Sequence, residues 1–365
     1  MRSMKTFGID ASALLKPNPT GVEKYARLLL SEMMKQPLGE GESVILYARD
    51  EKPSDLTLPA GWSWKALPFF FPKGWTHLCL AKELFQHPVD VFFSPAHEVP
   101  LATGSAKVVT TVHDVVFAKN PRLYSSFQNL RQRAAVKHAV RVASKLLAVS
   151  NSTKRDLVSL FGAVEEKVTV THLAPTVEAR SAEPKQGRYF LYIGRIEEKK
   201  NVGTLIEAFQ RFKEAAGADD STKLIIVGGV GFGGEKIVEA AKASPVAKDI
   251  EFPGYVSDAE ISALYAGALA FVFPSHDEGF GLPILDAMKM GTPTLLSDIS
   301  VFHEVAGSAA EYAAPTNPTE FAIKMKDLAE SAPLRSSLSQ RGLAQVEKYS
   351  WAETARQTWA ALRSV

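Results

Sequence analysis

The stretch "ALAFVFPSHDEGFGLPILDAMKMGTPTLLSD" (268–298) decides the fold of this sequence. It opens with an apolar run (268–275) that is typical of a buried strand, and it closes with a second such run (292–298). Between them lies a helical segment with Pro283 at its start, where a missing N–H costs nothing because the first N–H groups of a helix have no partner within it. The order strand, helix, strand indicates a parallel sheet that helices cover.

The same alternation extends along most of the chain. In the first half we expect strands at 5–10, 43–48, 89–95, 107–114 and 145–150, and helices at 21–36 and 151–162. A segment rich in proline, alanine and charge (174–188) is typical of an interdomain linker. After it we expect strands at 189–195, 223–229 and 250–256, and helices at 201–216, 234–243 and 258–267. The sequence therefore predicts two doubly wound α/β domains, with the loops after their strands lining a cleft between them.

The composition is that of an ordinary globular protein. The chain has 365 residues, of which 46% are hydrophobic and 22% charged, and its net charge of +2 gives no general attraction to nucleic acid. Cys79 is the single cysteine, so no disulfide can form within the chain, which favours a reducing compartment such as the cytoplasm. The first fifteen residues do not resemble a signal peptide, and no apolar window is long enough for a membrane span. We expect a cytoplasmic protein whose contact with a membrane is at most peripheral.

The turn before Pro283 has the properties of an anion site. Gly279 and Gly281 let the backbone come close to a ligand. The amides of Phe280, Gly281 and Leu282 lie at the positive end of the helix, where they have no intrahelical partner. A phosphate or a sugar hydroxyl can be bound there.

Two carboxylates flank this turn. Glu278 precedes the helix, where it can hold sugar hydroxyls, and Asp286 lies one turn inside it, where its carboxylate can grip a diol such as a ribose. Each residue alone has a plain alternative, because Asp286 also favours the helix dipole and Glu278 can simply be solvated. Their joint occurrence around one loop favours a binding function.

A basic pair follows the strand expected at 189–195. Arg195 stands at the carboxyl end of this strand, and Lys200 lies just before the next helix. A diphosphate leaving group needs fixed positive charge, which arginine supplies as a planar fork and lysine as a compact point charge. The alternative is a solvated loop in which "EEKK" (197–200) pairs locally. That alternative fits the intervening residues best: Glu197, Glu198 and Lys199.

Two residues of the first half are weaker candidates. Gly21 starts a helix after a strand and a loop, where a bare backbone can approach a phosphate or a sugar, although glycine there is more often only a turn. His113 ends the strand expected at 107–114 and can share a hydrogen bond with a substrate hydroxyl, although a single histidine is more often structural.

The segment "GGVGFGG" (228–234) matches the dinucleotide-binding pattern G-x-G-x-x-G at Gly229, Gly231 and Gly234. The match stands alone and follows the second strand of its domain instead of opening the domain, so we do not expect a dinucleotide. No acidic D-x-D cluster suits a metal ion, and neither a metal nor a cofactor is expected.

Residues 119–145 hold seven basic residues and no acid. Four of them, Arg133, Lys137, Arg141 and Lys145, repeat every four positions, which predicts one stripe along a helix. Upstream, "LPFFFPKGW" (67–75) places aromatic residues beside a lysine. Together these segments can seat an anionic membrane or a charged acceptor. The alternative is a solvated basic helix and an aromatic loop that faces the core.

Blocks spread over nearly the whole chain resemble glycosyltransferase family 4. They are "TGVEKYARLL" (20–29), "TVHDVVF" (111–117), "YIGRIEEKKN" (192–201), "FPGYVSDAEISALYAGA" (252–268), "HDEGFGLPILDAM" (276–288) and "SDISVFHEVAG" (297–307). The resemblance implies a GT-B fold with two Rossmann-like domains that face a cleft. These would be an acceptor-side domain at 1–178 and a nucleotide-sugar domain at 179–348, with a final helix (349–365) crossing back to the first.

The resemblance also implies roles for individual residues. The candidate catalytic residues are Arg195 and Lys200, which match the basic pair on the donor diphosphate, Glu278, which matches an acid on the donor sugar, and His113 beside that sugar. Asp286 falls at the acid that usually holds the ribose, and it is one methylene shorter than the usual glutamate. The other matches are candidate binding positions in loops and turns: Gly21, Tyr255, Val256, Phe280, Gly281 and Leu282.

The activity that the resemblance implies is metal-independent transfer of a hexose with retention at the anomeric carbon. The expected donor is GDP-mannose, because the blocks at 20–29 and 111–117 resemble those of mannosyltransferases. UDP-glucose or another nucleotide sugar is the alternative donor. The acceptor is expected to be a glycan or a lipid-linked saccharide, and no nucleic-acid partner is expected. The rival interpretations are a non-catalytic nucleotide-binding module and, within the same fold, an epimerase or a phosphorylase-like enzyme.

Overall fold

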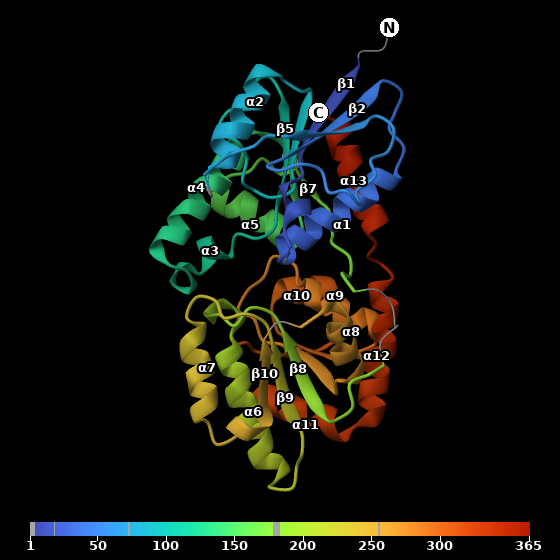
Figure 1. Ribbon diagram of the computed structural model, residues 1–365. Helices are drawn as coiled ribbons and strands as arrows, with labels where there is room; N and C mark the ends of the chain where they lie inside the picture. Colours follow the sequence, from blue (N-terminus) through green and yellow to red (C-terminus); the bar gives the residue numbers. More distant parts are fainter. Residues whose placement is uncertain (1–3, 18, 72–73, 178–182, 255) are drawn as a thin grey trace. The chain divides into compact units, whose positions relative to one another are not determined.

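The chain folds into two compact units (Figure 1). The computed structural model describes residues 4–17, 19–71, 74–177, 183–254 and 256–365. Unit 1 consists of Met1–Pro121, Ser126–Leu173 and Ser350–Val365, and unit 2 consists of Arg122–Ser125 and Ala174–Tyr349. The main part of unit 2 therefore begins at Ala174, whereas the sequence places the boundary after residue 178.

Unit 1 is built on seven parallel strands in the order β3-β2-β1-β4-β5-β6-β7. Central strands such as β4 are buried along their whole length, as expected where helices cover both faces of a sheet. The strands are Lys5–Asp10 (β1), Glu42–Ala48 (β2), Trp62–Ala66 (β3), Val91–Ser94 (β4), Lys107–Val112 (β5), Ala143–Ala148 (β6) and Val168–Val170 (β7). The helices before the unit 2 sheet are Gly21–Lys35 (α1), Ala81–Gln86 (α2), Val116–Lys119 (α3), Ser126–Val142 (α4) and Asn151–Phe161 (α5).

The last helix of the chain, α13 (Trp351–Arg363), packs on α1 and belongs to unit 1. Its Trp359 is buried, stands edge-on to Phe7 of β1 at 5.4 Å, and donates from Nε1 to the carbonyl oxygen of Met33 at 3.4 Å. Arg363 forms an ion pair with Glu42 at 2.8 Å. The chain thus returns to its first unit at its end.

Unit 2 is built on six parallel strands in the order β10-β9-β8-β11-β12-β13. The strands are Tyr189–Ile193 (β8), Lys223–Val227 (β9), Ile250–Gly254 (β10), Ala270–Phe273 (β11), Thr294–Ser297 (β12) and Glu311–Ala313 (β13). The helices are Val202–Ala216 (α6), Gly234–Ala243 (α7), Asp258–Gly267 (α8), Leu282–Lys289 (α9), Ser300–Ala306 (α10), Pro318–Glu330 (α11) and Ala332–Val346 (α12). α6 packs against α7 and α11, and α9 packs against α8, α10 and α12, so each face of the sheet has its own helix layer (Figure 1). The predicted doubly wound α/β class is confirmed for both units.

The direction of the strand order reverses at β8. This strand pairs with β9 on one side and with β11 on the other. The segments after β8 (194–201) and after β11 (274–281) therefore leave the same edge of the sheet as neighbours. Such a switch point is where open α/β sheets bind their ligands. In unit 1, β1 holds the equivalent position between β2 and β4.

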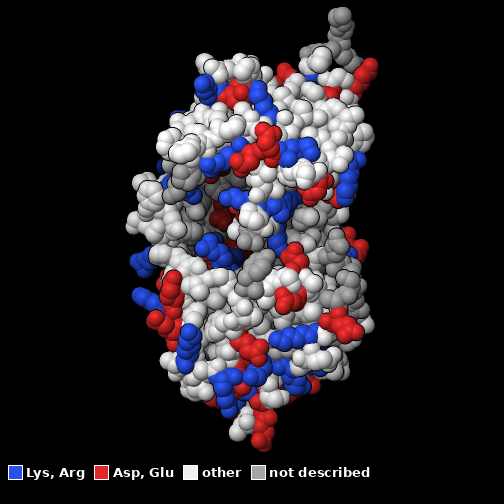
Figure 2. All heavy atoms as spheres, in the orientation of Figure 1, with Lys and Arg blue, Asp and Glu red and all other residues white. Residues whose placement is uncertain are grey.

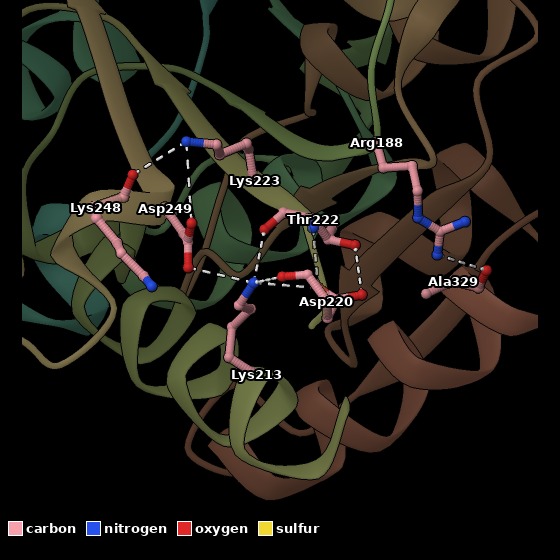
Figure 3. A network of polar contacts seen from close by, with 8 residues as sticks. All are labelled: Arg188, Lys213, Asp220, Thr222, Lys223, Lys248, Asp249 and Ala329. Atoms are coloured by element: carbon pink, nitrogen blue, oxygen red, sulfur yellow. Dashed lines mark hydrogen bonds and ion pairs between the residues drawn. The ribbon is translucent and has the colours of Figure 1, made fainter. Parts of the chain in front are cut away.

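The opposite edge of the unit 2 sheet carries a network of charged side chains (Figure 3). Lys213 of α6 lies between two carboxylates, with its Nζ 3.2 Å from Oδ1 of Asp220 and 3.2 Å from Oδ2 of Asp249. It also donates to the carbonyl oxygens of Asp220 and Thr222. All three protons of this ammonium group therefore have oxygen partners within the chain.

Three strands are absent from the sequence prediction: β3, β7 and β13. All three lie at the edges of their sheets, and β7 and β13 are only three residues long. A segment this short contains too few residues to display a period, and an edge strand needs less apolar sequence because only one neighbour pairs with it.

Charged side chains of both signs are interspersed on the face that Figure 2 shows, as the small net charge of +2 leads us to expect. Within the described part of the chain, no helix combines the length and the apolar character that a membrane span requires.

Candidate functional site

Lys200 and Glu278 meet at the switch point of the unit 2 sheet. Lys200 ends a short helical turn after β8, and Glu278 lies in the loop after β11. Nζ of Lys200 is 2.6 Å from Oε1 of Glu278, and the two side chains are 17% and 11% exposed. Among the residues that the structure describes, Glu278 is the only hydrogen-bonding partner of this ammonium group, which also lies 5.3 Å from the centre of the Phe273 ring. Two residues that the sequence singled out separately thus form one charged pair.

Asn201 holds the loop that carries Lys200. It is buried, and its backbone is left-handed with φ of 56°, a conformation that asparagine tolerates better than most residues. Its Nδ2 donates to the carbonyl oxygens of Pro274 at 2.9 Å and Pro315 at 2.7 Å. The loop after β8 is therefore tied to the loop after β11, which keeps Lys200 beside Glu278.

Two buried polar residues position Glu278, and sequence reasoning singled out neither. The hydroxyl of Ser275 donates to Oε1 of Glu278 at 2.7 Å, and the backbone N–H of Glu278 donates to Oδ1 of Asp277 at 2.9 Å. Their position in the sequence could have indicated this role, because polar residues directly after a buried strand lie at the ligand-binding edge of a parallel sheet.

Arg195 lies at the same edge with its side chain 63% exposed. Its carbonyl oxygen accepts a hydrogen bond from the buried Tyr192 hydroxyl at 2.9 Å. Its Nε is 3.9 Å from Oε2 of Glu197, whose other oxygen is 3.6 Å from Nζ of Lys199. The expected local pairing within 197–200 is present between Glu197 and Lys199, but the prediction that Glu197 is solvated is wrong, because it is buried beside these two cations. A buried carboxylate is tolerated only when it is paired in this way.

The glycine-rich loop (228–234) explains how Glu197 is covered. A Cβ at Gly231 would lie 2.9 Å from Oε2 of Glu197, and a Cβ at Gly234 would lie 2.0 Å from the carbonyl oxygen of Ile196. Ile196 also exchanges backbone hydrogen bonds with Gly229 and Gly231, at 2.9 and 2.8 Å. These contacts give Gly231 and Gly234 of the G-x-G-x-x-G match a packing role within the fold, whereas a Cβ at Gly229 would meet no atom within 4 Å.

The turn at 279–282 begins helix α9 at the same edge. Gly281 has φ of 109°, and a Cβ there would lie 2.8 Å from the Ile284 side chain, so the turn requires glycine. The neighbouring Phe280 is buried, with its ring edge-on to Tyr349 at 5.9 Å. Leu282 opens the helix, and Pro283 lies in its first turn. The buried Phe280 ring and the positive φ of Gly281 fix the backbone at 280–282, whose amides are expected to bind an anion.

The Asp286 carboxylate accepts hydrogen bonds from residues of the same unit. Its Oδ1 accepts from the backbone N–H of Thr176 at 2.5 Å and of Val177 at 3.3 Å, and its Oδ2 accepts from the Thr176 hydroxyl at 2.8 Å. The buried carboxylate thus fastens residues 176–177 to α9, a role that the sequence did not indicate. A ribose contact at Asp286 stays a prediction.

His113 of unit 1 is held in one tautomer. Its Nε2 lies 2.9 Å from the carbonyl oxygen of Pro95, and its ring stands edge-on to Tyr25 at 4.7 Å. A carbonyl oxygen can only accept, so Nε2 carries the proton and Nδ1 is the acceptor atom. Burial lowers the pKa of His113 to about 4, which keeps the imidazole neutral near pH 7.

Gly21 begins α1, where Thr20 and Glu23 form a capping box. A Cβ at Gly21 would meet no atom within 4 Å, so local packing does not require glycine at this position. The adjoining residues Val22 and Glu23 line a cavity of about 1160 Å³ within unit 1.

The cavity of unit 1 has a polar lining. It includes Asp10 at the end of β1, whose carboxyl pKa is raised by burial, together with His97, Glu98 and Arg131. Nδ1 of His97 is buried and has no hydrogen-bonding partner among the described residues. A polar molecule that entered the cavity would satisfy this atom.

The remaining predicted positions divide as follows. Val256 is half-buried just before α8, and Tyr255 lies outside the described residues. Unit 2 therefore brings together Arg195, Lys200, Glu278 and the turn at 279–282. No cluster of three or more His, Cys, Asp or Glu side chains that could hold a metal ion occurs in the described part of the chain.

The basic stripe expected at 133–145 is wrong in part. α4 ends before Lys145, which lies on strand β6. Arg133 is half-buried, and its guanidinium group donates to the carbonyl oxygen of Ala118 at 3.0 Å. Only Lys137 and Arg141 of the four are exposed on the helix.

Two family models together match nearly the whole chain. The model for glycosyltransferase family 4 matches residues 19–174, and the model for glycosyl transferases group 1 matches residues 175–345. The chain belongs to the family 4 glycosyltransferases. Its two parallel α/β units are those of the GT-B fold, as the sequence predicted.

Relatives of this glycosyltransferase include bacterial mannosyltransferases. O-antigen chain mannosyltransferase B of Escherichia coli is 28% identical over 265 residues, which cover 69% of each chain. O-antigen chain mannosyltransferase RfbU of Salmonella typhimurium is 30% identical over 234 residues, which cover 64% of this chain and 63% of the relative. The match therefore spans about two thirds of each of these relatives.

Solved structures share the fold of this glycosyltransferase at low identity. Sucrose-phosphate synthase from Thermosynechococcus elongatus has a TM-score of 0.75 and 15% identity, covering 99% of this chain and 98% of the other. Anabaena Alr3699/HepE in complex with UDP-glucose has a TM-score of 0.71 and 17% identity, covering 99% and 100%.

Proposed function

We propose that this glycosyltransferase moves a mannosyl group from GDP-mannose to a glycan or a lipid-linked saccharide, with retention at the anomeric carbon and without a metal ion. The single observation that carries the proposal is the meeting of Lys200 and Glu278 at the switch point of the unit 2 sheet. Arg195 and the Gly281 turn lie at the same edge. Arg195 is exposed, and Lys200 has a single acidic partner among the described residues. Both cations can therefore bind the oxygen atoms of a pyrophosphate at this edge.

In the proposed reaction the bond between the anomeric carbon and the diphosphate oxygen breaks. Arg195, Lys200 and the amides at 280–282 stabilise the negative charge that grows on the leaving diphosphate. Glu278 accepts hydrogen bonds from hydroxyls of the donor sugar. The acceptor hydroxyl attacks on the face that the diphosphate leaves, and its proton passes to a diphosphate oxygen. No side chain is assigned as a covalent nucleophile.

The proposed acceptor site is the cavity of unit 1. Its volume of about 1160 Å³ is large enough for a saccharide, and Asp10, His97 and Glu98 offer oxygen and nitrogen acceptors for sugar hydroxyls. His113, neutral and with Nδ1 as acceptor, is proposed to bind a hydroxyl of the donor sugar.

Mannose from GDP-mannose is favoured as the donor group because the two relatives described above are named mannosyltransferases. A UDP-sugar is the second candidate, because the HepE structure with the same fold holds UDP-glucose. Asp286 is proposed to reach the ribose only if it exchanges some of its bonds to Thr176 and Val177.

A panel of nucleotide sugars tests the proposal. Purified protein is incubated with GDP-mannose, UDP-glucose and further nucleotide sugars in the presence of EDTA, and released nucleotide is measured with and without oligosaccharide acceptors. We expect turnover of GDP-mannose that EDTA does not abolish, and a product whose anomeric configuration by NMR is that of the donor. Binding without turnover across an acceptor screen would favour a nucleotide-binding module, and neither binding nor turnover would refute the proposal.

A further inference from the structure

Helix α4 presents an exposed face that is both apolar and basic. Phe127 and Leu130 are 76% and 69% exposed, and Arg131, Lys137 and Arg141 are exposed as well. Positions 127, 130, 134, 137 and 141 recur at intervals of three and four residues, so they share one side of the helix. The helix contains no acidic residue, and among the described residues Lys137 and Arg141 have no ion-pair partner, whereas Arg131 lies near Glu98 and helps to lower the pKa of that carboxyl. A face with protruding apolar groups and unpaired cations is unusual on a surface that meets only water.

A second exposed apolar group lies on the helical segment 76–86, which ends in α2. Leu78 and Phe85 are 62% and 70% exposed, and the exposed Lys82 lies between them in the sequence. Just upstream, Phe70 and Phe71 are exposed, so the aromatic loop does not turn wholly toward the core.

The two helical segments belong to one flank of unit 1 (Figure 1). Residues 74–77 line the same cavity as five residues of α4: Arg131, Gln132, Ala134, Ala135 and His138. The loop between β4 and β5 joins them, because Nε2 of His138 on α4 lies 3.1 Å from the carbonyl oxygen of Pro100, and Gly104 packs on the backbone of Leu84. Leu101, 67% exposed, lies in this loop. We call the exposed residues of 76–86, of this loop and of α4 the α2–α4 flank.

We propose that the α2–α4 flank docks this protein on an anionic lipid bilayer. The exposed phenylalanine and leucine side chains would enter the boundary between headgroups and acyl chains, and Arg131, Lys137 and Arg141 would pair with anionic headgroups. Because the flank borders the cavity of unit 1, a saccharide carried on a membrane lipid would enter that cavity from the bilayer surface. The docking itself does not depend on the identity of the sugar donor.

The charge of the flank decides between a bilayer and a second copy of this chain. A twofold dimer would place the cations of α4 against those of the partner, with no acid on the helix to balance them. Glu98, an exposed acid in the loop of the flank, lies 3.7 Å from Nε2 of His77 in the same unit. An anionic bilayer offers the opposite charge and an apolar layer directly beneath it.

Vesicle sedimentation of the full-length protein tests the proposal. We expect binding to vesicles of equimolar phosphatidylcholine and phosphatidylglycerol, weak binding to phosphatidylcholine alone, and weaker binding as salt rises. The variant Lys137→Glu/Arg141→Glu should lower the partition coefficient at least about tenfold, since each cation contributes roughly a fivefold effect. Phe127→Ser/Leu130→Ser should lower it roughly tenfold by removing apolar insertion.

The chain offers matched controls. Lys236→Glu/Lys242→Glu on exposed positions of α7 makes the same change of net charge away from the flank, and Ile323→Ser/Leu343→Ser removes exposed apolar groups in unit 2. Both controls should bind vesicles like the wild type, and all variants should melt at the same temperature because the changed side chains are exposed.

Three results would overturn the proposal. The first is an absence of wild-type binding to the anionic vesicles at moderate salt. The second is an equal loss of binding in the α7 control, which would mean that net charge alone is responsible. The third is a wild-type dimer in sedimentation velocity that Phe127→Ser/Leu130→Ser dissociates, which would assign the flank to a second copy of the chain.

Discussion

Two lysines with largely buried side chains lie at opposite edges of the unit 2 sheet and differ in the number of acceptors around their charge. Lys213, at the amino-terminal edge, is surrounded by two carboxylates and two carbonyl oxygens (Figure 3). Lys200, at the carboxyl edge, has one carboxylate partner among the described residues, Glu278. Both side chains are largely removed from water, at 10% and 17% exposed.

The comparison shows that burial and ion pairing alone do not identify a functional residue. Lys213 has no donor left for a ligand, so its role is complete within the fold. Lys200 retains two N–H donors for oxygen atoms from outside, at the edge of the sheet where ligands bind. Residues whose hydrogen-bonding groups are all paired within the fold should therefore affect stability, whereas residues that keep groups for a ligand should affect activity.

Replacing Lys213 by methionine should have the largest effect, and the effect should be on stability. Asp220 would lose its cation, and Asp249 would keep only the partly exposed Lys223 at 3.9 Å, which costs about 3–5 kcal/mol for a broken buried pair. Urea denaturation measures this loss. The turnover number of the fraction that stays folded should be unchanged, and a loss of less than about 1 kcal/mol would mean that the network is not structural.

Replacing Lys200 by alanine should act on catalysis instead. Removal of one group that stabilises transition-state charge typically lowers kcat about 10²–10³-fold, or roughly 3–4 kcal/mol. Glu278 loses its cation but keeps its hydrogen bond from Ser275, so the melting temperature should also fall, by less than in the Lys213 variant, whose cation is shared by two carboxylates. Nucleotide release from the sugar donor gives the rate. An active Lys200→Ala enzyme would remove Lys200 from the proposed site.

In unit 1, His113 has one ring nitrogen of each kind. Its Nε2 is hydrogen-bonded to the carbonyl oxygen of Pro95, and its Nδ1 is available as an acceptor. Its folded pKa of about 4 is below the ordinary value of 6.5, so the unfolded state binds the proton more tightly. The free energy of unfolding therefore does not depend on this group above pH 6.5. As the pH falls toward 4, the unfolded state takes up the proton first, and the free energy of unfolding decreases by roughly 1–3 kcal/mol.

The variant His113→Gln isolates this contribution. The difference in unfolding free energy between wild type and variant should shrink as the pH is lowered from 7 to 4, measured by urea denaturation at each pH. A difference that grows on acidification would mean that His113 is charged in the folded protein.

Replacing Gly21 by alanine should have the smallest effect on stability. Any loss of activity in this variant can therefore be attributed to the site and not to unfolding. Alanine at this position meets open space, so the free energy of unfolding should change by less than about 0.5 kcal/mol. If the donor approaches the backbone at Gly21, kcat/KM should fall about tenfold, equivalent to about 1.4 kcal/mol. Gly234→Ala is the contrasting variant, because its Cβ would collide with the carbonyl oxygen of Ile196 and the protein should lose stability.

The parts of the structure that the sequence predicts are those with a local cause. The apolar run of β11 and the Gly281–Pro283 turn specify a strand, a left-handed glycine and a helix start from a few adjacent residues. The family resemblance assigns Lys200 to the diphosphate and Glu278 to the sugar of one donor, and the fold places the two side chains 2.6 Å apart.

The rest depends on residues distant in the sequence. The Asn201 side chain bonds to carbonyl groups 73 and 114 positions away, which no local pattern reveals. The pattern "EEKK" predicts a solvated Glu197, but this side chain is buried against the glycine loop at 228–234, about 30 positions away. Asp286 likewise finds its partner, Thr176, 110 positions away.

The most direct test of the central claim is a calorimetric titration in EDTA that compares a nucleoside diphosphate with its nucleoside, using GDP and guanosine or UDP and uridine. We expect the wild type and Lys213→Met to bind the diphosphate far more tightly than the nucleoside, and Lys200→Ala to lose at least tenfold in affinity for the diphosphate while its affinity for the nucleoside is unchanged. Equal affinity of Lys200→Ala and wild type for the diphosphate would contradict the assignment of this edge of the sheet as a pyrophosphate site.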